Sequence, residues 1–169
     1  MKRTLAILAL LIVFTATLAA LPSVAGAAVT LTKAERAVLA AVNKERTQRG
    51  LHVLRVNAAL TKAARAHVRD MAHHSYFSHT SLNGTSASAR ARSFGYSMAG
   101  WTSWRAGEVL ARATQGSAAA SPQQVVAGWM RSPSHRRVLL ARSFRDVGAG
   151  IHSGGSWQYV GLDLGRRVR

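Results

Sequence analysis

Three short stretches of this chain pair residue types that could do chemistry with residues that favour turns. These stretches are Phe77-Ser78-His79, Gly107-Glu108 and Ser132-Pro133-Ser134-His135. Only 6 residues are acidic against 23 lysines and arginines, so Glu108, beside a flexible glycine and among arginines, is the natural carboxylate of a site. Two imidazoles and a carboxylate can bind a divalent transition metal such as zinc with an open position, or can work as acid and base. His79, Glu108 and His135 are therefore the candidate site, although their spacing does not bring them together.

Each of these residues also has an ordinary structural role open to it. Histidines near serine and proline often cap helices or bond to loops. Glu108 could pair with Arg105 or Arg112 at the surface. His67 falls on the apolar face of a predicted helix, which favours a hydrogen-bonded core histidine over a ligand.

Several enzyme classes are disfavoured by motifs that the sequence lacks. It has no phosphate-binding glycine loop, no His-Glu-x-x-His zinc helix, no Gly-x-Ser-x-Gly elbow and no dinucleotide fingerprint. The absence of cysteine excludes disulfides, thiol nucleophiles and thiolate metal sites. Ser78 and Ser134 adjoin histidines, but neighbours in sequence rarely have the geometry of a nucleophile and its base, so a serine hydrolase is disfavoured.

The elements that must position these residues are mostly helices. Thr32 followed by Glu35 has the pattern of a capping box, and two Ser-Pro pairs place a proline at the first position of a helix. Apolar residues recur at helical spacing after these starts. The helices predicted are 32–49, a helix from Asn57 through Met71, 86–94, a helix from Ser121, and a short one from Ser132 that holds His135.

Strands are predicted at the end of the chain. Residues 147–151 alternate in polarity, 153–156 form a turn, and 157–164 return with alternating apolar residues, which predicts an antiparallel hairpin. The segment 96–104 could be a strand or a wide loop. Helices first and a meander last, without a repeating strand and helix rhythm, predict an α+β layered domain rather than a doubly wound sheet.

The first residues have the pattern of a secretory signal peptide. Lys2 and Arg3 are followed by an almost wholly apolar run and then by small residues. Because the apolar run is short for a membrane span, we expect cleavage rather than retention as an anchor. The predicted organisation is a signal peptide over 1–27 and one domain over 28–169, with no transmembrane segment after cleavage. The protein is therefore expected to be secreted, extracellular or associated with the cell wall.

The formal net charge of +17 predicts an anionic partner. Outside a cell the candidates are anionic cell-wall polymers, membrane headgroups and stray nucleic acid. In the predicted mature domain the basic residues are spread from Lys33 to Arg169 and do not form the aromatic and basic motif of a nucleic-acid module, so no specific nucleic acid is expected. An arginine-rich, solvated surface without a specific partner is the alternative.

Seven short motifs, in order along the chain, resemble those of one family. They cover roughly Lys33 to Gly165, nearly all of the predicted mature domain, and their order makes the resemblance specific. The chain resembles the bacterial branch of the CAP superfamily, the cysteine-rich secretory, antigen and pathogenesis-related proteins, also called SCP domains. The motifs are Val42-Asn43-Lys44-Glu45-Arg46 with Gly50-Leu51, Ala63 to Ala72, Phe77-Ser78-His79, Gly95-Tyr96, Gly107-Glu108, Trp129 to Arg136, and Val147-Gly148-Ala149-Gly150.

The resemblance implies an α-β-α sandwich with a central antiparallel sheet and a wide cleft. In that family two histidines and one or two glutamates line the cleft, and some members bind zinc or another divalent cation there. Carried over by motif, the histidines are His79 and His135 and the first glutamate is Glu108, the trio already chosen from residue types. The resemblance therefore implies that these three residues are metal ligands and that the cofactor is zinc or another divalent cation.

Three departures from the family pattern bear on this site. Val109 replaces the asparagine of a Gly-Glu-Asn motif, which removes an amide that could orient the glutamate or line the cleft. No second glutamate lies between Trp129 and Ser134. The stretch 97–106 looks like an insertion, and its two tryptophans either bind sugars, lipids or partners or fold back onto the sheet. These differences are compatible with a weaker metal site, or with none.

The leading hypothesis is a secreted, monomeric CAP-domain protein whose cleft binds a small ligand, a lipid or a divalent ion at or near the cell envelope. An enzymatic alternative is a metal-assisted hydrolase in which Glu108 is the catalytic base that activates a water and the two imidazoles hold the ion. A further alternative is a cationic protein that adheres to anionic cell-wall polymer and leaves its cleft idle.

Overall fold

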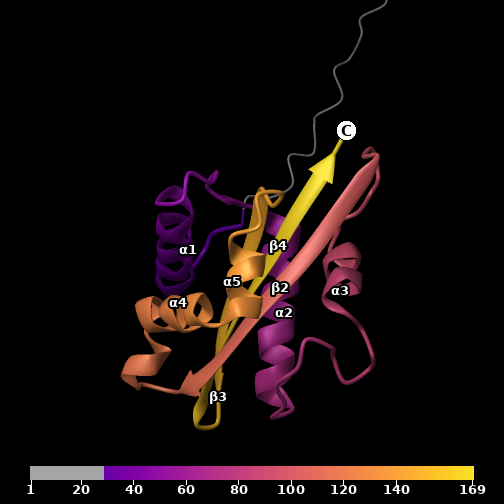
Figure 1. Ribbon diagram of the computed structural model, residues 1–169. Coiled ribbons are helices and arrows are strands. Elements are labelled where there is room, and N and C mark those ends of the chain that lie inside the picture. Colours follow the sequence, from indigo (N-terminus) through magenta and orange to yellow (C-terminus); the bar gives the residue numbers. More distant parts are fainter. Residues whose placement is uncertain (1–28) are drawn as a thin grey trace, which may run out of the picture.

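A computed structural model describes residues 29–169 of the chain, so the predicted signal peptide lies outside the described residues. Within them, helices come first and the longest strands come late (Figure 1). In chain order the elements are α1 (Lys33–Thr47), β1 (Arg55–Val56), α2 (Ala58–His73), α3 (Ala87–Ser93), β2 (Ser103–Thr114), the 3-10 turn η1 (Ala118–Ala120), α4 (Pro122–Arg131), α5 (Pro133–Leu139), β3 (Asp146–Gly154) and β4 (Trp157–Val168).

The sheet forms the middle of three layers. Its strand order is β1-β3-β4-β2, with α2 and α3 against one face and α1, α4 and α5 against the other (Figure 1). The three long strands are antiparallel, as predicted. The two-residue β1 is the difference, because it pairs in parallel with the start of β3 and makes the sheet mixed. The predicted α+β class and the α-β-α sandwich are confirmed.

The predicted helix starts are confirmed. Thr32 accepts a hydrogen bond from the Glu35 backbone, and the Glu35 side chain accepts one from Thr32 in return, so the capping box is complete. Asn57 caps α2 through the backbone amides of its first turn. At Ser121 and Ser132 the proline that follows begins the helix, but neither serine side chain makes a capping bond.

The strand β2 is only partly visible in the sequence. The segment 96–104 fits a strand or a loop equally well, whereas the structure has a strand of 12 residues that begins at Ser103. Along its whole length β2 pairs with β4. As an edge strand it is half exposed on much of its surface, so it lacks the clear alternation of polarity that marks the final hairpin.

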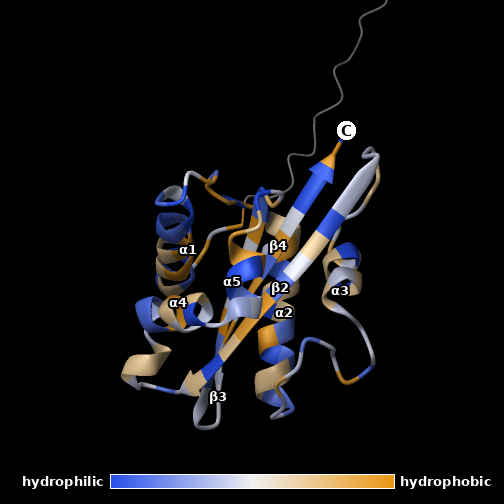
Figure 2. Ribbon diagram, viewed as in Figure 1, coloured by the Kyte–Doolittle hydropathy of each residue, from blue (hydrophilic) through white to orange (hydrophobic). Residues whose placement is uncertain are grey.

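The apolar core lies on both faces of the sheet, where the helices turn their hydrophobic stripes inward (Figure 2). On the α2 face the packing is unusually close, because Gly148 and Gly150 of β3 lie directly against the α2 backbone. On the other face the buried Arg46 of α1 donates hydrogen bonds to backbone carbonyls at the end of α5 and in the loop that follows. The first contact packs α2 tightly on the sheet, and the second joins α1 to α5 within the other helical layer.

Candidate functional site

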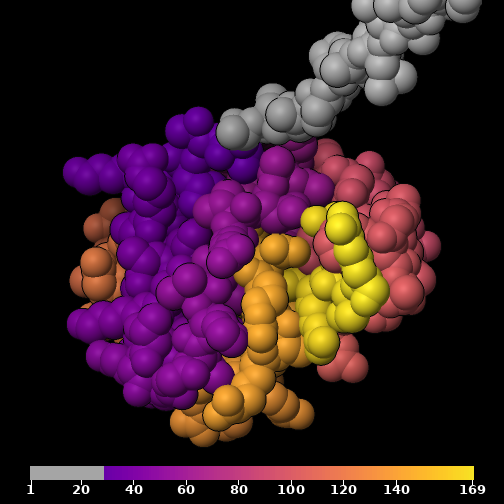
Figure 3. Space-filling model, turned by 90° about the horizontal axis from the view of Figure 1, so that it is seen from above, coloured from indigo at the N-terminus to yellow at the C-terminus, as the bar shows by residue number. Residues whose placement is uncertain are grey.

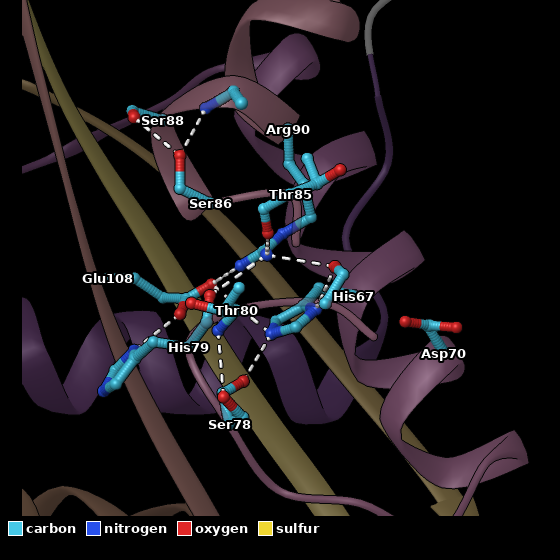
Figure 4. Close-up of polar contacts among 12 residues, drawn as sticks. His67, Asp70, Ser78, His79, Thr80, Thr85, Ser86, Ser88, Arg90 and Glu108 are labelled. Atoms are coloured by element: carbon cyan, nitrogen blue, oxygen red, sulfur yellow. Dashed lines mark hydrogen bonds and ion pairs between the residues drawn. The ribbon is translucent and has the colours of Figure 1, made fainter. Parts of the chain in front are cut away.

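An exposed histidine and a buried glutamate are in direct contact at the centre of the site. His79 lies in the loop between α2 and α3 with 59% of its side chain exposed, whereas Glu108 on β2 exposes only 3%. Nδ1 of His79 lies 2.6 Å from Oε2 of Glu108 (Figure 4). Since an ionised carboxylate only accepts hydrogen bonds, Nδ1 carries the proton and donates it. The other ring nitrogen, Nε2, is then a lone-pair acceptor on an exposed ring.

Arg90 of α3 neutralises the buried glutamate. Its side chain is only 7% exposed, and Nη2 forms an ion pair with Oε1 of Glu108 (Figure 4). Nη1 donates to the backbone carbonyls of His79, at 3.1 Å, and Thr85, at 2.9 Å. One guanidinium therefore balances the carboxylate and also fastens the loop that carries His79.

His67 of α2 supports the same loop from below. It is buried, and its Nε2 lies 2.8 Å from the carbonyl oxygen of Ser78, so Nε2 is the donor. Burial lowers the pKa of His67, which keeps the ring neutral. The interpretation of His67 as a core histidine is confirmed, although its Nε2 is also only 3.9 Å from Oε1 of Glu108.

Asp163 of β4 is a second buried carboxyl group directly behind Glu108. The two residues are paired across the antiparallel strands and their side chains lie on the same face of the sheet. Asp163 is 2% exposed. Burial, the charge of Glu108 and a hydrogen bond to Glu108 raise the pKa of Asp163 well above its ordinary value. The raised pKa favours the protonated form of Asp163 beside the Glu108 carboxylate.

Asp163→Asn is expected to stabilise the domain relative to the wild type, increasingly so as the pH rises above about 4. Because the folded-state pKa of Asp163 is raised, the folded protein holds more protons than the unfolded chain in this range, and the wild type loses stability as the pH rises toward that pKa. Asparagine has a similar shape and no proton to lose. Denaturant unfolding of both proteins at about pH 4.5 and pH 7.5 measures the difference. A difference that does not change with pH contradicts a raised pKa of Asp163 in the folded protein.

His135 of α5 borders a groove along the free edge of β2. The groove has a volume of about 370 Å³ and includes Phe77, Leu110 and Trp129 in its lining. Burial is the main cause that lowers the pKa of His135, and the charge of the nearby His79 lowers it further. Nδ1 of His135 is buried without a hydrogen-bond partner. His135 therefore faces the same region as His79 with a neutral ring and an unused nitrogen.

The structure thus places the three predicted site residues around one edge of the sheet, with His79 and Glu108 in contact and His135 nearby. Within residues 29–169, no three His, Cys, Asp or Glu side chains are grouped so that they could hold one metal ion. Both oxygens of Glu108 are already engaged, by His79 and Arg90. The metal ligands that remain at the site are one imidazole nitrogen of His79 and one of His135. Imidazole nitrogens suit zinc, but two ligands are fewer than a zinc site usually has. Metal binding stays a prediction.

Val109 replaces the asparagine of the family motif, but its position shows that an amide there would not orient Glu108. It is fully buried in the core, on the face of β2 opposite to Glu108, because neighbouring strand residues point to opposite faces. An amide at this position would not reach the carboxylate of Glu108. The orientation of Glu108 comes instead from Arg90 and His79.

Arg90, His67 and Asp163 are the site residues that the sequence did not single out for this role. Arg90 is one of 23 lysines and arginines, and its type carries no signal. Asp163 did carry one, because an acidic residue inside an apolar strand requires a partner or a proton. Asp70 lies apart from Glu108 (Figure 4) and pairs with His74 and the Tyr76 hydroxyl near the end of α2.

The comparisons with known proteins agree with this fold. The family described as "CAP: Cysteine-rich secretory protein family" matches residues 39–164. The chain belongs to the CAP family. The uncharacterized protein YkwD of Bacillus subtilis is 35% identical over 130 residues, which make up 75% of this chain and 47% of the Bacillus protein. The chain therefore spans about half the length of that relative.

Two solved bacterial structures resemble this CAP domain in fold. An extracellular protein containing an SCP domain from Bacillus anthracis superimposes with a TM-score of 0.66 at 22% identity, covering 82% of this chain and 45% of that one. An outer surface protein from Borrelia burgdorferi has a TM-score of 0.65 at 22% identity, covering 78% of this chain and 91% of that one. Among the helices of residues 29–169, none is both long and apolar enough to cross a bilayer.

Proposed function

We propose that this CAP-domain protein is exported and that the groove lined by His135, together with the nearby His79, binds a ligand or a divalent cation at or outside the cell envelope. The observation that carries the proposal is the exposed His79 ring held by the buried pair of Glu108 and Arg90. Export is supported by the pattern of residues 1–27 and by the similarity to an extracellular and an outer surface protein.

The network behind His79 prepares its exposed nitrogen for binding. Glu108 accepts the Nδ1 proton, so Nε2 keeps its lone pair and the ring keeps one orientation. The cationic Arg90 pairs with Glu108, and the raised pKa of Asp163 disfavours a second negative charge beside it. A ligand can therefore be held by Nε2 without first having to order the ring.

The lining of the groove suits a ligand with an apolar part. Phe77, Leu110 and Trp129 contribute apolar surface, while Arg112 and His135 contribute polar groups. A small molecule or a lipid with one polar or anionic end fits this combination. The ligand's polar end would lie toward the two histidines.

For a divalent cation, the residues in place are Nε2 of His79 and a ring nitrogen of His135, with Glu108 as the partner behind His79. Such an ion would supply positive charge to polarise a bound group. The hydrolase alternative with Glu108 as base is less well supported, because that carboxylate is buried and both its oxygens are engaged. The exposed His79 is better placed than Glu108 to accept a proton.

Zinc titration by calorimetry tests the cation form of this proposal. The predicted mature chain, 28–169, is expected to bind one zinc ion, and His79→Ala and His135→Ala should each weaken binding by at least about tenfold. His152→Ala is the matched control, because His152 is an exposed histidine on β3, away from the groove, and should leave binding unchanged. If zinc does not bind, or if all three variants behave alike, the cation form is wrong and the groove should be searched for organic ligands.

A further inference from the structure

A second hollow lies at the other end of the long strands, away from the groove. It has a volume of about 380 Å³ and is formed where β2 begins and β4 ends. The end of β4, in yellow in Figure 3, reaches the surface beside the pink chain that leads into β2. The hollow is lined by Ser103, Trp104, Arg105, Ser143, Arg166 and Val168.

Two arginines of this hollow face each other across the strands. Arg105 and Arg166 are direct cross-strand partners, and both are exposed. Like charges in this position destabilise an antiparallel pair. Among residues 29–169 neither arginine has an ion pair or a side-chain hydrogen bond. An anion bound between them would turn this repulsion into attraction.

In the part of the chain that the structure describes, no acidic side chain forms an ion pair with Arg105 or Arg166. Asp146 is adjacent in the sheet, opposite Gly165, but a residue in that register points to the other face. There its carboxylate accepts a hydrogen bond from the Tyr96 hydroxyl at 2.7 Å. The hollow is therefore lined by cationic, hydroxyl and apolar groups without an acidic side chain.

The strand ends that carry the hollow are held in place from the opposite face. Arg167, the neighbour of Arg166, stacks on Tyr96 at 4.6 Å and on Trp101 at 4.7 Å from the ring centres. Trp104 packs edge-on against Tyr96. The tryptophans of the insertion-like stretch thus fold back onto the sheet, and the backbone under Arg105 and Arg166 is fixed before any ligand arrives.

We propose that Arg105, Arg166, Ser103 and Ser143 form a phosphate-binding site that is separate from the groove. Guanidinium groups bind phosphate oxygens through paired hydrogen bonds, and the two serine hydroxyls supply further donors for a tetrahedral anion. The phosphate comes either as the free ion or as one unit of a phosphodiester polymer outside the cell. The net charge of +17 predicts anion binding but does not say where on the surface it occurs. The proposed site gives that binding a defined place.

Nitrogen-15 NMR of residues 28–169 tests the proposal. Inorganic phosphate is titrated at about 0.15 M sodium chloride, where general surface attraction is screened. The expected shifts are confined to amides around Ser103, Ser143 and Arg166, and Arg105→Gln/Arg166→Gln should weaken binding at least about tenfold. A parallel titration with poly(glycerol phosphate) distinguishes the sources, since tighter binding per phosphate identifies the polymer and equal binding identifies the free ion.

The matched control is Lys62→Gln/Arg69→Gln, which removes the same charge from two exposed residues of α2. This double variant should bind phosphate like the wild type. His79→Ala should also bind phosphate like the wild type, because a loss of zinc binding in that variant concerns only the groove. Equal loss in the two charge variants, shifts spread over the surface, or no binding of either probe would overturn the site.

Discussion

Replacing Arg90 with alanine is expected to destabilise the domain by about 3–5 kcal/mol, because it leaves the Glu108 carboxylate buried without its cation. Glu108 is 3% exposed and cannot regain water without moving β2 or the loop above it. Denaturant unfolding of the variant and the wild type measures the loss.

Arg92→Ala is the matched control for Arg90. Arg92 lies on the same helix but is exposed, and its guanidinium carbon lies over the Trp104 ring, 5.6 Å from the ring centre. An exposed contact of this kind contributes about 0.5–1 kcal/mol. Arg90→Lys should fall between the two, since it restores the charge without the planar fork that reaches both Glu108 and the loop carbonyls. Equal losses at Arg90 and Arg92 would show that Glu108 does not depend on Arg90.

The Arg90→Ala substitution should also weaken binding at the groove. Arg90 holds the backbone carbonyls of His79 and Thr85, so its loss frees the loop at the residue whose ring must be oriented. In the Arg90→Ala variant, ligand or zinc binding at the groove is expected to weaken even under conditions where the protein remains folded. Arg90 is thus a positioning residue, and its effect reaches the ligand through His79.

Local sequence signals predicted most of the fold. Capping residues and helix-starting prolines act within a few residues of where they stand, and the glycine turn of the last hairpin does the same, so they are visible without tertiary structure. The strand β2 lacked such a signal. It is an edge strand whose partner β4 lies about 50 residues later, and only that pairing defines its register.

The candidate site was predicted less completely, and for a related reason. His79, Glu108 and His135 were found because their types are rare and their motifs resemble those of a family. The residues behind them are defined by burial. Arg90 looks like any other arginine until α3 packs beside β2, and the pKa of Asp163 is raised because folding buries this residue next to Glu108. Neither fact can be read from spacing.

Gly148→Ala is expected to destabilise the domain by about 3 kcal/mol or more, at or above the upper end of the usual cost of overpacking. A Cβ atom at this position would lie 2.0 Å from the carbonyl carbon of Leu60 and 2.1 Å from the amide nitrogen of Thr61. These are backbone atoms, so no side chain can turn away and α2 itself must move. Thermal or denaturant unfolding measures the loss.

Gly128→Ala is the matched control, because it adds the same methyl group where there is room. Gly128 lies in α4, and the nearest atom to an added Cβ is a side-chain nitrogen of Arg131 at 4.0 Å. Removing a helical glycine should stabilise the domain by about 0.5–1 kcal/mol, the opposite sign.

Because α2 also carries His67, which bonds to the loop before His79, the Gly148 variant should lose groove binding together with stability. A neutral effect at Gly148 would mean that α2 does not depend on this close contact, and the position of His67 would then need another cause.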